Sequence, residues 1–147
     1  MPQQLFRKIL VAHDGSEPAT RAFEKALLLA ALTTADLHVI SIGEKVPKYP
    51  ATAGEVEDYE EDMEGYFGKL HKQLREQADE HKIPLHTHLE YGHEVKAVTK
   101  FVDRNRFDLL VIGGVRRPGI LKRLLGNWGS TAHNLARLSP CTVLVVK

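Results

Sequence analysis

Short runs of apolar residues recur along the chain and predict five β-strands. Most of these runs are nearly continuous in Val, Ile and Leu, which is typical of parallel strands that are buried on both faces. The third run instead alternates polar and apolar residues, as a half-exposed strand does. The predicted strands span residues 6–12, 36–42, 83–90, 108–114 and 141–146.

Apolar residues spaced three and four positions apart predict a helix in each segment between these strands. In the first helix the repeating positions are Ala19, Ala22, Phe23, Ala26, Leu27 and Ala30. The second is a long stripe over residues 56–78, and Gly65 and Gly68 fall within it, so a break in this helix stays open. The third and fourth helices are predicted over residues 93–106 and 131–138.

Strands that alternate with helices predict an α/β fold. We expect a single-domain, doubly wound, five-stranded parallel sheet with helices on both faces, a Rossmann-like fold, because right-handed crossovers leave few other arrangements. A chain of 147 residues without internal repeats predicts one domain spanning residues 1–147. Ligands of such sheets bind beyond the carboxyl ends of the strands, where the strand order reverses. If the first strand is central, the site lies between the turns that follow the first and fourth strands.

The charges of the chain nearly cancel. The formal net charge is +1, so no overall field attracts nucleic acid or an anionic membrane. No apolar run is long enough to span a bilayer, and the first residues lack the pattern of a secretory signal. The single cysteine, Cys141, can form no internal disulfide, which fits a reducing compartment. We therefore expect a soluble, cytoplasmic protein that binds neither nucleic acid nor membranes.

A glycine-rich, basic segment follows the fourth predicted strand and reads GGVRRPGILKRLLGNWGS over residues 113–130. It can be a long turn with a solvated basic face, or a phosphate cradle made of backbone N–H groups that glycine leaves accessible. The common phosphate-binding signatures G-x-x-x-x-G-K-[ST] and G-x-G-x-x-G are absent. The start of the last helix, at Ser130 and Thr131, would still offer free N–H groups and two hydroxyls to an anion.

Two stretches of the chain resemble the universal stress protein family. They are KILVAHDGSEPATRAFEKALLLAA and, near the end, DLLVIGG with GSTAHNLARLSPCTVLVV. The resemblance implies the five-stranded fold of the adenine nucleotide alpha hydrolase-like kind, with G-x2-G-x9-G-[ST] in nucleotide-binding members. Gly119 and Gly129-Ser130 match the second half of that motif, whereas Arg116 stands where the first glycine belongs and Gly113 lies three residues earlier.

The resemblance also implies roles for single residues. The cofactor-binding positions are Ala12, Asp14, Ile42, Gly113, Gly119, Gly129, Ser130 and Thr131. Asp14 would contact the adenine, Ile42 would pack on the base, and the last three positions would hold phosphates. Simpler roles stay open, because Asp14 or Ser16 can cap the first helix, and Ser130 and Thr131 can be helix caps only. The cations of the loop would favour a triphosphate if they turn inward, and they are Arg116, Arg117, Lys122 and Arg123.

The function that this resemblance implies is a regulatory stress-response module that binds ATP or a related adenine nucleotide, with or without Mg. One alternative is a family member that binds no nucleotide and works through contacts with a protein partner. A second alternative is a slow ATPase or a phosphotransfer protein. No catalytic residue is assigned, because the chain offers no evident general base or pair of metal-binding carboxylates for hydrolysis.

Two further expectations concern the sheet edges. His86 and His88 share one face of the third predicted strand. No cysteine, carboxylate pair or H-E-x-x-H spacing completes a metal site with them. We therefore interpret these histidines as part of a half-exposed face of an edge strand. The terminal strand, TVLVV, would be apolar with open backbone groups at the other edge, which invites pairing with a second copy. The resemblance implies a homodimer through that strand.

Overall fold

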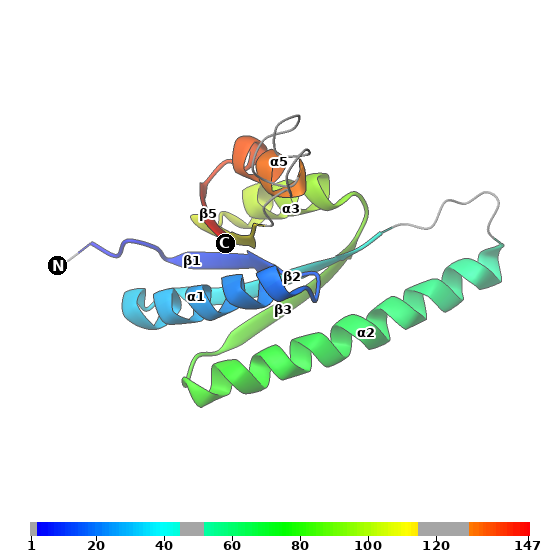
Figure 1. The fold of residues 1–147 in the computed structure, drawn as a ribbon, viewed down its shortest axis with the longest axis horizontal. Helices are drawn as coiled ribbons and strands as arrows, with labels where there is room; N and C mark the ends of the chain where they lie inside the picture. Colours follow the sequence, from blue (N-terminus) through cyan, green and yellow to red (C-terminus); the bar gives the residue numbers. More distant parts are fainter. Residues whose placement is uncertain (1–2, 45–51, 115–129) are drawn as a thin grey trace.

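The computed structural model describes residues 3–44, 52–114 and 130–147. Strands and helices alternate along these ranges (Figure 1). In chain order they are β1 (Lys8–Ala12), α1 (Glu17–Thr33), β2 (Asp36–Gly43), α2 (Ala53–Glu80), β3 (Leu85–Tyr91), α3 (Glu94–Asn105), β4 (Leu109–Gly113), α5 (Ser130–Leu138) and β5 (Thr142–Val146). Among the helices of these ranges, none combines the length and the apolar character that a membrane crossing requires.

The five strands form one sheet in the order β3-β2-β1-β4-β5, and every neighbouring pair is parallel. β1 is central, because Leu10 aligns with His38 of β2 on one side and with Leu110 of β4 on the other. The chain therefore fills one half of the sheet first, then crosses to the other half at β4. This arrangement confirms the predicted doubly wound α/β fold, with β3 and β5 at the two edges.

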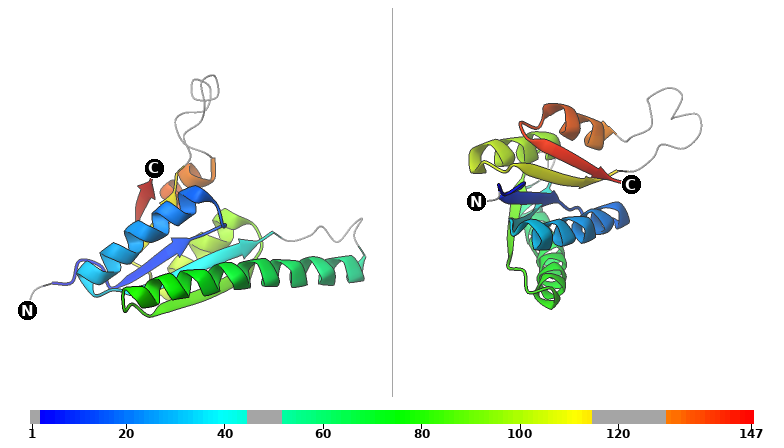
Figure 2. Two further views of the ribbon diagram at one scale, coloured as in Figure 1. Left: turned by 60° about the horizontal axis from the view of Figure 1, so that its bottom comes forward. Right: turned by 90° about the vertical axis from the view of Figure 1, so that its left-hand side faces the viewer.

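Helices cover both faces of the sheet, with α1 and α2 on one face and α3 and α5 on the other (Figure 2). All six apolar positions predicted for the first helix are buried in α1. Five of them, all except Ala19, pack with Ile9, Val11 and Val39 of the central strands. On the other face, the valines of α3 pack with Leu10, Ile40 and neighbouring apolar residues. The alternation of strand side chains thus supplies two separate cores.

Local signals in the sequence set where α1 and α2 begin. Ser16 is the N-cap of α1, and its hydroxyl accepts a hydrogen bond from the Ala19 N–H at 3.4 Å. Thr52 begins α2 in a capping box, because its hydroxyl accepts from the Glu55 N–H while the Glu55 carboxylate accepts from the Thr52 N–H. Of the two open choices for capping the first helix, the structure therefore selects Ser16.

α2 is one continuous helix of 28 residues, so Gly65 and Gly68 do not break it. Its buried side chains all lie in the second half, and they are Phe67, His71, Leu74 and Ala78. The first half is joined to the end of β3, where the Tyr91 hydroxyl donates to the Glu60 carbonyl at 3.3 Å. The first half extends past the ends of the strands (Figures 1 and 2). The apolar stripe predicted over residues 56–78 is therefore buried along half of its length.

Candidate functional site

The strand order reverses between β1 and β4, and a cavity of about 300 Å³ opens beyond their carboxyl ends. Ala12 and Asp14 line it from the end of β1, Gly113 from the end of β4, and Thr131 from the first turn of α5. Ligands of open parallel sheets bind at such a position. The topology thus brings together residues that lie more than 100 positions apart in the sequence.

Two further hollows adjoin this cavity through shared residues. One, of about 200 Å³, lies toward the end of β2 and is lined by Ile40, Ile42 and Glu44 as well as by Ala12 and Asp14. The other, of about 420 Å³, is lined by Glu44, Gly92, His93, Glu94, Val95 and Thr131. The three hollows together form the candidate site at the carboxyl edge of the sheet.

Five of the eight residues predicted for this site line its hollows. Ala12, Asp14, Gly113 and Thr131 line the cavity between β1 and β4, and Ile42 lines the neighbouring recess. Ser130 begins α5, and its side chain lies outside what the structure describes. The predicted positions outside the described residues are Gly119 and Gly129, together with the four cations Arg116, Arg117, Lys122 and Arg123.

The first turn of α1 forms one wall of the cavity between β1 and β4, called the main cavity below. Gly113 allows β4 to approach this helix closely. A Cβ at Gly113 would lie 2.6 Å from the Pro18 carbonyl oxygen and 2.8 Å from the Ala19 nitrogen. Both are backbone atoms, so a side chain at this position would have to displace the helix. Glycine at Gly113 is therefore a requirement of packing between β4 and α1, whatever else it does.

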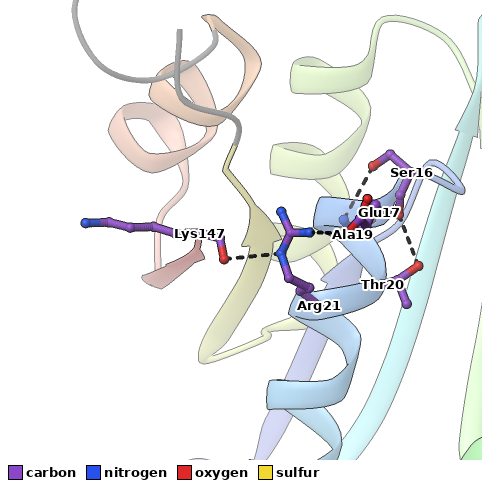
Figure 3. Close-up of polar contacts among 6 residues, drawn as sticks. All are labelled: Ser16, Glu17, Ala19, Thr20, Arg21 and Lys147. Carbon is purple, nitrogen blue, oxygen red and sulfur yellow. Dashed lines mark hydrogen bonds and ion pairs between the residues drawn. The ribbon is translucent and has the colours of Figure 1, made fainter. Parts of the chain in front are cut away.

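The same part of α1 is joined to the end of the chain. Figure 3 shows Arg21, whose Nε donates a hydrogen bond to the Lys147 carbonyl oxygen at 3.2 Å. Its Nη1 also forms an ion pair with the Glu17 carboxylate at 3.0 Å, one helical turn earlier. This arginine connects the first two turns of α1 with the residue that follows β5.

The turn after β1 carries Asp14 and is held by local hydrogen bonds. The Asp14 carboxylate accepts from the Ser16 N–H at 2.9 Å, and His13 Nδ1 accepts from the Gly15 N–H at 3.0 Å. Gly15 has a φ of 89°, a conformation that a residue with a Cβ rarely adopts. The His13 N–H continues the pairing with β2 by donating to the Ile40 carbonyl at 2.9 Å.

A buried polar network supports this turn from the α2 side of the sheet. The Ser41 hydroxyl donates to the His13 carbonyl oxygen at 2.6 Å and lies 2.8 Å from Nε2 of His71. Since the Ser41 proton is used on His13, Nε2 of His71 acts as the donor to Ser41. Burial, with a smaller contribution from Arg75, lowers the pKa of His71 to about 4, so this histidine is neutral at pH 7. Tyr66, also on α2, donates to the Asp14 carbonyl at 3.5 Å.

Three acidic side chains, Asp14, Glu44 and Glu94, are among the described residues that line the site. Glu94, the first residue of α3, lines all three hollows. Its pKa is raised, first by burial and then by the charges of Asp14 and Glu44. No lysine or arginine is among the described residues that line these hollows. Sequence reasoning missed Glu94 and Glu44, although Glu44 lies two residues and Glu94 four residues after the end of a predicted strand.

A second cluster of titratable groups lies on β2 and β3, where the sequence predicted the half-exposed face. His38 Nδ1 lies 2.9 Å from His88 Nε2, and the His38 ring also stacks on His86 with centroids 4.5 Å apart. Burial and the two neighbouring histidines lower the pKa of His38 to about 4. Across residues 3–44, 52–114 and 130–147, no group of three or more His, Cys, Asp or Glu side chains is arranged to hold a metal ion.

The fold and the cavity define the protein as an open, doubly wound parallel α/β domain with a ligand-sized cleft at its switch point. The chain belongs to the universal stress protein family, because the family model matches residues 5–147. This finding confirms the resemblance seen in the sequence.

Individual relatives agree with this assignment. Universal stress protein MJ0531 of Methanocaldococcus jannaschii is 27% identical over 146 residues, which cover 99% of this chain and 84% of that protein. The universal stress protein UspA from Lactobacillus plantarum has a TM-score of 0.83 at 21% identity, over 97% of this chain and 98% of that one. The crystal structure of a universal stress protein in complex with cAMP has a TM-score of 0.74 at 27% identity, with 97% of both chains covered.

Proposed function

We propose that this protein is a single-domain, cytoplasmic regulatory module of the stress response that binds ATP or a related adenine nucleotide. The observation that carries the proposal is the cavity at the switch point, which is lined by Ala12, Asp14, Gly113 and Thr131. These four residues were assigned to the nucleotide site from the sequence. Further support comes from the 27% identical universal stress protein whose structure contains cAMP.

In this proposal, different residues contact different parts of the ligand. The recess beside Ile40 and Ile42 holds the flat, apolar base, and the Asp14 carboxylate accepts hydrogen bonds from its donors. The Thr131 hydroxyl and the free N–H groups of the first turn of α5 face the phosphate end. Each of these groups binds or orients the ligand, so the proposed role is binding, with hydrolysis slow at most.

The test is to identify what the protein carries. Purified protein is denatured, and the supernatant is analysed by ion-exchange chromatography. Asp14→Asn is compared with Asp79→Asn, an exposed aspartate of α2 away from the hollows. The asparagine side chain keeps an oxygen that can accept from the Ser16 N–H, so the turn is preserved while the charge is lost. We expect bound adenine nucleotide in the wild type and in Asp79→Asn, and at least tenfold weaker binding in Asp14→Asn.

If the extracts contain no nucleotide and added ATP, AMP and cAMP give no calorimetric signal, the proposal is wrong. If Asp14→Asn binds nucleotide as tightly as the wild type, the proposed ligand stands, but Asp14 does not contribute to its binding. These two outcomes are separate, because the first concerns the ligand and the second concerns one residue.

We also propose that two copies pair through β5. This strand lies at the edge of the sheet, and its Leu144 side chain is 37% exposed. An edge strand with an exposed apolar side chain is a template for pairing with another chain. Light scattering at micromolar concentration should give a dimer for the wild type and a monomer for Leu144→Asp. A monomeric wild type would contradict this part of the proposal.

A further inference from the structure

Glu94 lines every part of the candidate site. It is the first residue of α3, and it is the only described residue that lines all three hollows. It shares the main cavity with Thr131 and the recess beside β2 with Ile42. Any molecule that extends from the recess into the main cavity therefore passes its carboxylate.

The groups that face Glu94 come from each neighbouring element. Asp14 belongs to the turn after β1, Glu44 follows β2, and His93 precedes α3. The two carboxylates add negative charge at the same place, while His93 acts in the opposite direction. Among the described residues that line the hollows, the acidic side chains are Asp14, Glu44 and Glu94.

We propose that Glu94 acts as a charge filter in the site, because its carboxylate weakens the binding of an adenine ligand more, the more phosphate charges the ligand carries. This inference rests on the proposed function, because it concerns the same cavity and the same class of ligand. The physical reason is Coulomb repulsion in a partly buried site, where water screens charges less than in bulk. Each additional phosphate charge near Thr131 is repelled by the carboxylate that shares that cavity.

The protonation state of Glu94 gives the selectivity a pH dependence. Burial and the charges of Asp14 and Glu44 raise the pKa of Glu94, so it takes up a proton at a higher pH than an ordinary glutamate. A protonated Glu94 no longer repels phosphate. The discrimination against charged ligands should therefore weaken as the pH falls through this raised pKa.

The experiment compares three ligands that share adenosine and differ in charge. Dissociation constants of adenosine, AMP and ATP are measured by calorimetry between pH 5 and pH 8, in buffer with chelator, after removal of bound nucleotide. The proteins are the wild type, Glu94→Gln and the control Glu24→Gln, which changes an exposed glutamate of α1 outside the hollows. Thermal unfolding confirms that each variant is folded.

For Glu94→Gln at pH 8 we expect about tenfold tighter binding of ATP, a smaller gain for AMP and an unchanged constant for adenosine. The ratio of the ATP and adenosine constants should change with pH more steeply in the wild type than in Glu94→Gln. Because ATP titrates in this range too, only this difference between the proteins reports on Glu94. Glu24→Gln should behave like the wild type, and Glu44→Gln should shift the ratio in the same direction by a smaller factor.

Two outcomes would overturn the inference and leave the proposed function intact. One is an ATP to adenosine ratio that is the same in Glu94→Gln and in the wild type at every pH. The other is an equal loss for all three ligands, which would make Glu94 a hydrogen-bond acceptor rather than a charge filter. If no adenine ligand binds the wild type, the proposed function itself fails, and the inference fails with it.

Discussion

The two faces of the sheet differ sharply where β1 and β2 end. On the α2 face, the Ser41 hydroxyl is enclosed and is paired with the His13 carbonyl oxygen and with His71. On the α3 face, the same strand ends open into hollows with carboxylates on their walls. Adjacent residues of β2 belong to different faces, because side chains alternate along a strand.

This difference indicates that one face stabilises the fold and the other binds the proposed ligand. Buried hydrogen bonds fix the backbone of the turn that carries Asp14, so its carboxylate is presented from a defined position. The open face then carries the charges that meet a ligand. Substitutions on the closed face should therefore reduce the stability of the fold, whereas substitutions on the open face should change binding.

The largest loss of stability is expected for Gly113→Ala, where β4 packs against α1. The new Cβ would meet backbone atoms of Pro18 and Ala19, which cannot move without shifting the helix. Overpacking of this kind costs about 3 kcal/mol in a tight site. Gly65→Ala is the control, because a Cβ there meets nothing and alanine favours the helix. Urea unfolding should give a lower midpoint for the first variant and an equal or higher midpoint for the second.

A smaller loss is expected for Ser41→Ala on the closed face. It leaves the His13 carbonyl and the His71 N–H without their shared partner, at a cost of about 1 to 2 kcal/mol. On the open face, Glu44→Gln should change the free energy of unfolding by less than about 0.5 kcal/mol, because its side chain is exposed. Equal effects of the two substitutions in urea unfolding would remove the contrast between the faces.

At neutral pH the smallest effects come from the buried titratable groups, and on changing the pH the contributions of His71 and Glu94 to stability should have opposite signs. The pKa of His71 is about 4 in the folded protein, below its ordinary 6.5, so stability is lost as the pH falls from about 6.5 toward 4. His71→Gln should reduce that loss, and His38, whose pKa is also about 4, accounts for a further part. The pKa of Glu94 is raised instead, so its contribution falls as the pH rises through that value.

Glu94→Gln should consequently unfold at a higher temperature than the wild type at pH 7, and at a similar temperature at pH 4. Thermal unfolding of both variants from pH 4 to pH 8 would check the two signs. A wild-type stability that is flat between pH 4 and pH 6.5 would contradict the assignment for His71.

Much of the fold follows from local patterns in the sequence. The apolar positions of α1 are predicted one by one, because a helix face is defined by the spacing of its own residues. The central place of β1 is a condition of the predicted site rather than a prediction, and the observed strand order fulfils it. Ser16 and Thr52 mark helix starts through residues only three positions away.

The site is less predictable, because its contacts join distant segments. Ser41 and His71 are thirty positions apart, and their pairing depends on how α2 lies on the sheet. His71 lies four residues after Phe67 and three before Leu74, so the helical period places it on the buried face, but a polar side chain there is not counted by a search for apolar residues. Glu94 reads as an ordinary first-turn acid of a helix, which is favourable at that position for local reasons. Which residues lie next to Glu94 in the folded protein cannot be predicted until the arrangement of the strands is known.

Two tyrosines determine how far the first half of α2 can move relative to the sheet. The Tyr66 hydroxyl donates to the Asp14 carbonyl, and the Tyr91 hydroxyl, at the end of β3, donates to the Glu60 carbonyl at 3.3 Å. The helix from Ala53 to Glu60 is about 10 Å long at 1.5 Å per residue, so a rotation of about 10° around Glu60 would displace Ala53 by only about 2 Å. The acidic end of the helix is thus coupled mechanically to the strand end beside the candidate site.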